Sequence, residues 1–423
     1  MNTGYKLRLI IHNILYDIQN LEITFDTALN KYLHKKTSKR DIAFINTVSL
    51  NTMRYSFHSK KILKKYARKK TKIHEEILLY SAITQIVFLK FKEYAVINET
   101  VEISKKLKLY HGYINACLRK ISKEKEILKK TNINYSDLPS WFKKKTENLD
   151  SFQIKLFIDN FYKEPDIHLV FKNKKYLSSF EKDLFITSEK SGFLVKKQRI
   201  EEIASFKRGN WWVQDFSSSF PLNNINNKII AKKCLDMCAA PGGKSFQILS
   251  RKKNIVLNDK SKTRIMTLKE NLTRLAFYPT ITNFDFKKIS KKNLYDFIVV
   301  DAPCSAVGTI RKNPEIFYRK KEPDFFGLIK VQREMLEAAS QLLKDNGIIL
   351  YMVCSFLKIE TVDQISSFLS KHKQFKLSNF SIEISDYNNF QFIENDQMLI
   401  LPSQLNKYNI DGYFAAYLKK GVE

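Results

Sequence analysis

Residues 295–308 read YDFIVVDAPCSAVG, a run of apolar residues that ends in an aspartate and a Pro-Cys pair. A run that is apolar throughout, without alternation, is typical of a strand buried on both faces of a parallel sheet. Similar short runs occur in CLDMC, NIVLND and GIILYMV, with helix-like stretches such as 261–275 and 325–344 between most of them. This alternation predicts an α/β fold with a doubly wound parallel sheet, whose ligands bind at the carboxyl ends of the strands.

The balance of charged residues is strongly basic. Counting 73 Lys+Arg against 43 Asp+Glu gives a formal net charge of +30 over 423 residues. An excess of this size favours a polyanionic partner, and nucleic acid is the usual one. Lysine far outnumbers arginine, so the drift of a lysine-rich genome is an alternative source of part of the charge. The length exceeds one ordinary hydrophobic core, which predicts two or three domains.

Residues 1–130 are predicted to form a helical domain, since they contain no proline and two glycines. Their apolar residues recur three to four positions apart, and Ser38 followed by Asp41 is typical of a capped helix start. Residues 131–206 are predicted to be a small α/β connector, with strands in IHLVFK from Ile167 and GFLVKK from Gly192. Residues 207–423 hold the alternating pattern and form the predicted third domain. In the first domain, helices are expected at roughly 41–57, 58–66, 75–91, 98–107 and 112–121.

The five cysteines form neither a CxxC pair nor a zinc-binding spacing with histidine. We therefore expect reduced thiols, no metal and a reducing compartment. The apolar stretch at the N-terminus is interrupted by His12, Asn13 and Asp17, which argues against a signal peptide. The longest apolar run, ILLYSAITQIVFLKF from Ile77, is too short to span a bilayer. These features predict a soluble, cytoplasmic protein without a membrane partner, and we expect a monomer.

A turn of small residues follows the apolar run CLDMC. Residues 239–244 read AAPGGK, and small residues after a strand let the backbone approach a ligand closely. An ordinary strand-to-helix turn can have the same composition, and the phosphate-binding patterns GxxxxGK[ST] and GxGxxG are absent. Asp259 ends the next apolar run, where an acidic residue suits the hydroxyl pair of a ribose. Capping of the helix 261–275 is the alternative role for Asp259, and Asp285 could reach the same pocket from the following strand end.

Asp301 and two cysteines stand at the ends of apolar runs. A carboxylate at the end of a fully apolar strand costs free energy unless it meets a ligand or a partner. Cys304 follows Asp301 in DAPCS, and Cys354 ends GIILYMVCS. A buried cysteine usually acts as a small hydrophobic residue. Two cysteines at ligand-binding strand ends instead favour a nucleophile, whose pKa Lys244 or Arg311 could lower.

The basic pair Arg311 and Lys312 follows the DAPCS loop. We predict that it binds RNA through phosphate contacts beside a target base. A solvated basic turn is the alternative for this pair.

Five motifs carry a resemblance to a known family: VQDFSS from Val213, LDMCAAPGGK, DAPCSAVGTIRKNPE, YMVCS and DGYFAAYLKK from Asp411. Through them, residues from about 205 to 420 resemble the RNA 5-methylcytosine methyltransferases of the Sun/Fmu (RsmB-like) family, which use S-adenosylmethionine. SKRDIAF from Ser38, INETVEISKK from Ile97 and INACLRKI from Ile114 resemble the NusB-type RNA-binding domain of members that modify 16S rRNA. The resemblance implies a Rossmann-like, S-adenosyl-L-methionine-dependent methyltransferase domain preceded by an all-α NusB-like domain.

The resemblance also implies roles for individual residues. Cys354 would attack carbon 6 of a cytosine so that carbon 5 accepts the methyl group, and Cys304 would assist release, with Asp301 and Lys244 in the catalytic set. Two positions depart from the family: Val353 stands where Thr is usual, and Thr361 follows Glu360 where Asn is usual. The implied cofactor contacts are Cys238, Ala239, Ala240, Pro241, Gly242, Gly243, Lys244, Asp259, Asp285 and Asp301.

Two other functions remain open from the sequence. One is a tRNA cytosine methyltransferase of the same chemistry, because the motifs of the catalytic half do not separate rRNA from tRNA. Only the N-terminal domain favours small-subunit rRNA as the partner. The other is a ribosome-assembly factor that binds RNA without catalysis, against which the intact cysteine pair argues.

Overall fold

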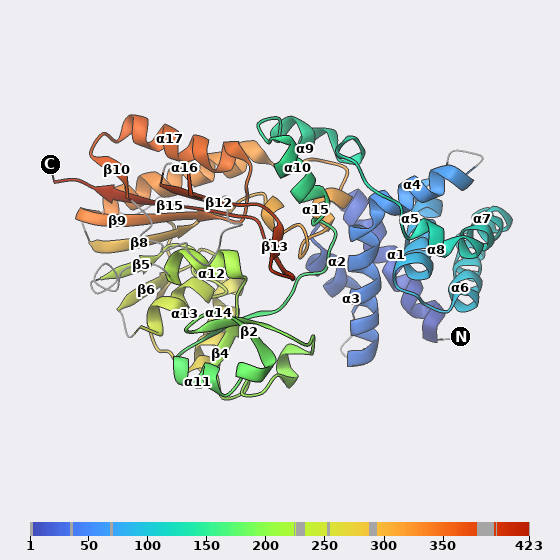
Figure 1. Ribbon diagram of the computed structural model, residues 1–423, viewed down its shortest axis with the longest axis horizontal. Helices are drawn as coiled ribbons and strands as arrows, with labels where there is room; N and C mark the ends of the chain where they lie inside the picture. Colours follow the sequence, from blue (N-terminus) through green and yellow to red (C-terminus); the bar gives the residue numbers. More distant parts are fainter. Residues whose placement is uncertain are drawn as a thin grey trace. The chain divides into compact units, whose positions relative to one another are not determined.

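The computed structural model describes residues 3–33, 37–67, 71–223, 225, 233–251, 254–286, 294–378, 393–394 and 396–422. The chain divides into two compact units, and each of them contains more than one stretch of the sequence (Figure 1). The helical unit contains Met1–Glu147, Phe161–Lys163 and Ile310–Pro323. The catalytic unit contains Asn148–Asn160, Glu164–Thr309 and Asp324–Glu423.

Helices with one apolar face form the helical unit. In α1, Ile11, Ile14 and Ile18 follow the predicted spacing, and all three are buried. Ser38 caps α3 as predicted, because its Oγ accepts a hydrogen bond from the backbone N–H of Asp41 at 3.1 Å. The helices of this unit before residue 130 are α1 (Thr3–Leu21), α2 (Phe25–Tyr32), α3 (Lys39–Arg54), α4 (Ser56–Tyr66), α5 (Ile73–Ile83), α6 (Glu93–Lys106), α7 (His111–Lys123) and α8 (Lys125–Leu128).

The helix predicted at 75–91 changes its winding before it ends. α5 passes into a π-helical turn, η1 (Thr84–Phe88). The side-chain amide of Gln85 donates to the carbonyl of Ser81 at 3.1 Å, the acceptor that the backbone N–H of Gln85 would use in a regular α-helix. This local competition, which apolar periodicity does not reveal, explains the difference.

The segment Ile310–Pro323 belongs to the helical unit, although the sequence pattern placed it in the catalytic domain. It contains α15 (Glu315–Tyr318), and Tyr318 packs in the core cluster that includes Ile11 and Phe25. Arg54 donates from Nε and Nη2 to the carbonyl of Arg311, at 3.0 and 2.8 Å. The Glu315 carboxylate accepts the first amide of α2, that of Phe25, at 3.3 Å. The predicted domain boundaries at 130 and 206 stay predictions.

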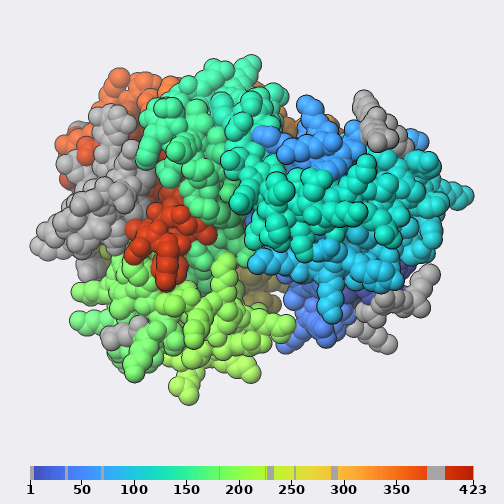
Figure 2. All heavy atoms as spheres, turned by 45° about the vertical axis from the view of Figure 1, so that its right-hand side comes forward, coloured from blue at the N-terminus to red at the C-terminus, as the bar shows by residue number. Residues whose placement is uncertain are grey.

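The catalytic unit begins with α10 (Ser151–Ile158), and a small antiparallel sheet follows it. Its order is β2-β3-β1-β4, and the two strands predicted in this region are β1 and β3. A hairpin of β13 (Ser403–Leu405) and β14 (Tyr408–Ile410), orange-red in Figure 2, lies against it. The ring of Tyr408 stacks on that of Phe193 with centroids 4.9 Å apart. The strands of the small sheet are β1 (His168–Phe171), β2 (Leu184–Ser188), β3 (Ser191–Leu194) and β4 (Trp211–Val213).

The large sheet contains the predicted parallel strands in the order β7-β6-β5-β8-β9. Helices cover both faces, as the doubly wound fold requires (Figure 1). One face carries α16 (Phe325–Leu342) and α17 (Val362–Lys371), and the other carries α12 (Phe216–Asn223), α13 (Gly243–Leu249) and α14 (Lys262–Leu275). The parallel strands are β5 (Cys234–Asp236), β6 (Ile255–Asn258), β7 (Thr280–Thr282), β8 (Tyr295–Asp301) and β9 (Leu343–Val353).

Antiparallel strands extend this sheet beyond β9. β15 (Tyr413–Lys420) pairs with β9, and β12 (Gln397–Ile400) pairs with β15. β10 (Phe375–Ser378) also pairs with β15, and β11 (Ile393–Glu394) pairs with β12. The sequence pattern did not predict this extension, which brings the start of β15 to the carboxyl end of β9. In the described part of the chain, no helix is long and apolar enough to cross a membrane.

Candidate active site

The turn between β5 and α13 contains the AAPGGK stretch. Gly242 has a φ of +122°, a conformation that side-chain-bearing residues rarely adopt. A Cβ atom on Gly242 would lie 2.0 Å from Cζ of Phe246, so the turn also lacks space for a side chain. The backbone conformation and the packing of Phe246 therefore both require a glycine at this position of the turn.

Asp236 lies beneath this turn, and the sequence analysis did not single it out. Its carboxylate accepts the backbone N–H of Cys238 at 3.3 Å and the hydroxyl of Ser245 at 2.6 Å. These bonds hold both sides of the glycine turn. Burial raises the pKa of Asp236 to about 7. An aspartate inside an otherwise apolar strand was the available signal.

Asp259 follows β6 and is 2% exposed. Its carboxylate accepts the backbone N–H of Ala240 at 3.2 Å and that of Ser261 at 2.9 Å. The N-cap of α14 is Ser261, whose Oγ accepts from Arg264 N–H at 3.3 Å, so Asp259 is not the capping residue. Asp259 instead fixes the glycine turn from the neighbouring strand. The ribose contact stays a prediction.

Asp285 stands beyond β7, the next strand of the sheet. Its carboxylate pairs with the ammonium of Lys260 at 3.0 Å, which places it beside the residue that follows Asp259. The carboxyl ends of β6 and β7 therefore each carry an aspartate on the same edge of the sheet. Its contact with a cofactor stays a prediction.

Asp301, at the end of β8, forms a polar group with Lys244 and Tyr413. Lys244 Nζ lies 2.5 Å from Asp301 Oδ2, and the hydroxyl of Tyr413 donates to Asp301 Oδ1 at 2.8 Å. The Lys244 ammonium also lies 5.3 Å from the centroid of the Tyr413 ring. Burial raises the pKa of Tyr413, so this hydroxyl keeps its proton. Lys244 thus pairs with the carboxylate of Asp301, whereas the sequence had suggested that it lowers the pKa of a cysteine thiol.

The two predicted cysteines meet because β8 and β9 are parallel neighbours. Cys304 Sγ and Cys354 Sγ are 3.2 Å apart, and both are free thiols. The hydrogen bond with Cys354, followed by burial, raises the pKa of Cys304 well above its usual range. Cys304 therefore holds its proton at neutral pH. Val353, a departure from the family pattern, is fully buried at the end of β9.

Arg311 and Lys312 lie in the segment that belongs to the helical unit. Arg311 is fully buried, and its carbonyl is held by Arg54, whereas Lys312 is exposed. Of the predicted pair, Lys312 is the side chain that a phosphate can reach in this structure. The phosphate contact itself stays a prediction.

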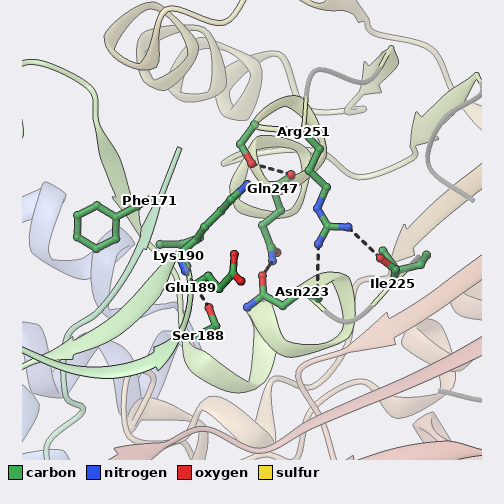
Figure 3. Close-up of a pocket in the computed structure, with 10 residues that line it drawn as sticks. Phe171, Ser188, Glu189, Lys190, Asn223, Ile225, Gln247 and Arg251 are labelled. Carbon is green, nitrogen blue, oxygen red and sulfur yellow. Dashed lines mark hydrogen bonds between the residues drawn. The ribbon is translucent and has the colours of Figure 1, made fainter. Parts of the chain in front are cut away.

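A pocket of about 300 Å³ lies at the other end of α13 (Figure 3). Arg251 lines it and donates to the carbonyls of Leu222 and Ile225, at 2.5 and 3.0 Å. Lys190 lines it from the β2–β3 turn. None of the predicted site residues is among its lining residues. Within the described ranges, no three His, Cys, Asp or Glu side chains gather as a metal ion would require.

The strand ends together offer two adjoining sets of groups. One set is a glycine turn with Asp259 and Asp285, which suits a nucleoside. The other is a pair of thiols next to Asp301 and Lys244, which suits nucleophilic attack on a ring with hydrogen bonding to its polar edge. Sequence reasoning gave no role in the site to three residues: Tyr413, Asp236 and Glu360. Glu360 accepts hydrogen bonds from Ser305 and Ser355, which lie in the loops that carry Cys304 and Cys354, the two cysteine loops.

Two family models match separate parts of the chain. Residues 222–419 match the family model described as 16S rRNA methyltransferase RsmB/F, and residues 5–123 match the NusB family. Ribosomal RNA small subunit methyltransferase B of Photorhabdus laumondii is 29% identical over 405 residues, which cover 89% of this chain and 93% of the relative.

Two solved structures have the same fold. The crystal structure of PH0851 has a TM-score of 0.71 at 21% identity, with 99% of each chain covered. That of NSun6 from Pyrococcus horikoshii has a TM-score of 0.55 at 17% identity, covering 67% of this chain and 99% of the other.

Proposed function

We propose that this S-adenosylmethionine-dependent enzyme methylates carbon 5 of a cytosine in 16S rRNA. The support is the match of residues 222–419 to the 16S rRNA methyltransferase RsmB/F model and of residues 5–123 to the NusB family. The reaction proceeds through a covalent bond between Cys354 and carbon 6. The observation that carries this proposal is the 3.2 Å approach of the Cys304 and Cys354 thiols beside the Asp301–Lys244 pair. The NusB-family domain supports rRNA as the substrate.

The residues of the glycine turn fit the cofactor. Cys238 to Lys244 would hold it, with Asp259, Asp285 and Asp301 around it, because the parallel strands β5 to β8 bring their carboxyl ends to one edge of the sheet. S-adenosylmethionine supplies an electrophilic methyl carbon when it is bound. Asp236, hydrogen-bonded to Cys238 and Ser245, keeps the turn in shape.

The thiols perform the covalent chemistry. The thiolate of Cys354 would add to carbon 6, and the electron pair that reaches carbon 5 would form the bond to the methyl carbon. The bond between this carbon and the sulfonium sulfur would break at the same time, with its electron pair staying on the sulfur. Once the Cys354 sulfur is bonded to carbon 6, the hydrogen bond that raises the pKa of Cys304 is lost. Cys304 then gives its proton to solvent and takes the carbon 5 proton. The carbon 5–carbon 6 double bond then re-forms, and the electron pair of the carbon–sulfur bond returns to Cys354. One proton is released overall, as replacement of hydrogen by the methyl group of a sulfonium requires. Asp301 and Lys244 hydrogen-bond the polar edge of the cytosine while charge develops on the ring.

A transfer assay tests the substrate. Radiolabelled methyl groups from S-adenosylmethionine are expected in 16S rRNA taken from a deletion strain, at a cytosine that bisulfite sequencing reports as methylated only in the wild-type strain. Label in tRNA alone would establish the tRNA alternative. Rescue of ribosome assembly without any label would establish the non-catalytic one.

Replacing Asp259 with alanine is expected to weaken S-adenosylmethionine binding about tenfold to a hundredfold, the equivalent of a hydrogen bond to a charged group, about 1.5–3 kcal/mol. The loss has two sources: the predicted ribose contact and the bond to Ala240 N–H that shapes the turn. Calorimetry without RNA measures it. Ser261→Ala, which removes the cap of α14 and leaves Asp259 in place, is the matched control. Equal affinities in wild type and Asp259→Ala would contradict a role in the pocket.

RNA affinity is expected to fall steeply with salt, because a net charge of +30 favours many phosphate contacts. Six to ten such contacts would lower the association constant roughly 10³- to 10⁵-fold between 50 and 200 mM salt. Filter binding with an rRNA fragment over this range gives the slope, and S-adenosylmethionine affinity serves as the control that should change little. An RNA affinity that does not change with salt would indicate that the lysine excess reflects compositional drift and not an RNA-binding surface.

A further inference from the structure

A single buried carboxylate lies under both cysteine loops. Glu360 ends the short helix η8 (Lys358–Glu360) that follows β9, and it is 0% exposed. One carboxylate oxygen accepts the backbone N–H of Ser305 at 2.8 Å and the amide of Gln332 at 3.2 Å. The other accepts the hydroxyls of Ser305 and Ser355, at 2.5 and 2.6 Å.

The partners of this carboxylate are the neighbours of the two thiols. Ser305 directly follows Cys304, and Ser355 directly follows Cys354. Gln332 of α16 also donates to the carbonyl of Pro303 at 3.0 Å, so the Cys304 loop is held on both sides of its sulfur. The hydroxyl of Tyr351 donates to the Glu360 carbonyl at 2.9 Å and ties η8 back to β9.

A buried carboxylate is costly unless its oxygens are fully hydrogen-bonded. Within the described residues, no lysine or arginine forms an ion pair with Glu360, and the four donors satisfy it instead. Loss of the carboxylate would leave four donors without an acceptor and would free two loops at once. The network therefore couples the position of one thiol to that of the other.

We infer that Glu360 is a positioning residue that holds Cys304 against Cys354 for the release of methylated RNA. The inference rests on the proposed function. Attack on carbon 6 needs Cys354 alone, whereas release needs Cys304 in register with the base that Cys354 has captured. Loosening the loops therefore slows release more than attack, and the covalent adduct accumulates.

The test is the ratio of covalent protein–RNA adduct to methylated product, measured on denaturing gels with radiolabelled 16S rRNA and S-adenosylmethionine. Glu360→Ala and Ser355→Ala are expected to raise this ratio about tenfold to a hundredfold, the effect of misplacing a reacting group by about 1 Å. Glu360→Gln is expected to stay near wild type. Its amide oxygen accepts the two N–H donors, and its NH₂ donates to serine hydroxyls that can rotate to accept.

Thr361→Val is the matched control. The Thr361 hydroxyl is buried next to Glu360 but donates to the carbonyl of Leu357, and among the described residues it has no hydrogen bond to the loops of Cys304 and Cys354. Thr361→Val removes one buried hydrogen bond, as Ser355→Ala does, but it should leave the adduct-to-product ratio unchanged. Ser355→Ala, which removes one of the four bonds, carries the test if Glu360→Ala does not fold.

A purely structural role lowers adduct and product in proportion, so an unchanged ratio in both Glu360→Ala and Ser355→Ala overturns the inference. If the adduct-to-product ratio rises in Glu360→Gln but not in Ser355→Ala, the inference is also overturned. The charge of Glu360, and not its hydrogen bonds, would then control release. Failure of the proposed function has a different signature: wild type makes no 5-methylcytosine, and Cys304→Ala traps no adduct.

Discussion

Replacing Cys354 with alanine is expected to abolish methyl transfer, with a loss of at least ~10³-fold, because a covalent mechanism has no substitute for its nucleophile. The variant should also form no covalent bond to RNA. The same experiment on Cys304→Ala is expected to give the opposite picture. Attack and methyl transfer proceed, release stalls, and an adduct that survives denaturing electrophoresis accumulates only when S-adenosylmethionine is present.

The two thiols lie 3.2 Å apart, so proximity alone does not say which one attacks. The resemblance of YMVCS to the family motif is what favours Cys354 as the attacking thiol. The reverse assignment predicts adducts from Cys354→Ala and none from Cys304→Ala. Cys117→Ala, which removes a buried thiol from α7 in the helical unit, is the control and should behave as wild type. Adducts from neither catalytic variant would count against covalent catalysis.

Gly242→Ala is expected to give the second-largest loss, in both stability and cofactor binding. A φ of +122° is a conformation reserved for glycine, which costs another residue about 1–3 kcal/mol. The new Cβ would also lie 2.0 Å from Phe246, a ring packed against Trp212 in the core, and overpacking adds about 1–3 kcal/mol. Because the turn can relieve this strain only by moving, S-adenosylmethionine affinity should fall at least tenfold, roughly the 1.4 kcal/mol that a tenfold change requires.

Gly243→Ala is the neighbouring control. Its Cβ would lie 3.3 Å from the side chain of Gln214, against 2.0 Å for the contact at Gly242, so its neighbour has to shift much less. Thermal melting and calorimetry on both variants separate the two positions. Wild-type melting and affinity in Gly242→Ala would show that the turn tolerates a side chain.

The site residues that could be predicted from the sequence are those that directly follow an apolar strand, because their position depends only on the end of that strand. Cys304 and Cys354 each follow a fully apolar run, and such runs form parallel neighbours whose carboxyl ends meet. Asp259 and the glycine turn follow the same logic on β5 and β6. Ser38 was predictable as a helix cap because the signal lies within four residues.

Residues that depend on long-range pairing were not predictable. Tyr413 reaches Asp301 only because β15 runs antiparallel to β9, with Phe414 opposite Val353. The sequence around Tyr413 predicts an apolar strand, but it does not indicate that this strand brings the hydroxyl to Asp301. Arg311 was predicted, with Lys312, to contact RNA phosphate next to the catalytic loop. It is instead fully buried, and its segment packs with helices encoded some 250 residues earlier. Apolar periodicity gives the element and the buried face but not the element on the other side.

During translation, the helical unit has to wait for residues far downstream. An N-terminal domain normally folds first as the chain leaves the ribosome. Here Tyr318 fills a place among Ile11 and Phe25, and Glu315 satisfies the first amide of α2. Until residue 318 has been synthesised, the nascent helices lack part of their core. The segment 310–323, which follows the DAPCS loop, therefore determines when the helical unit can finish folding. That unit is completed only after strands β5 to β8 have been synthesised.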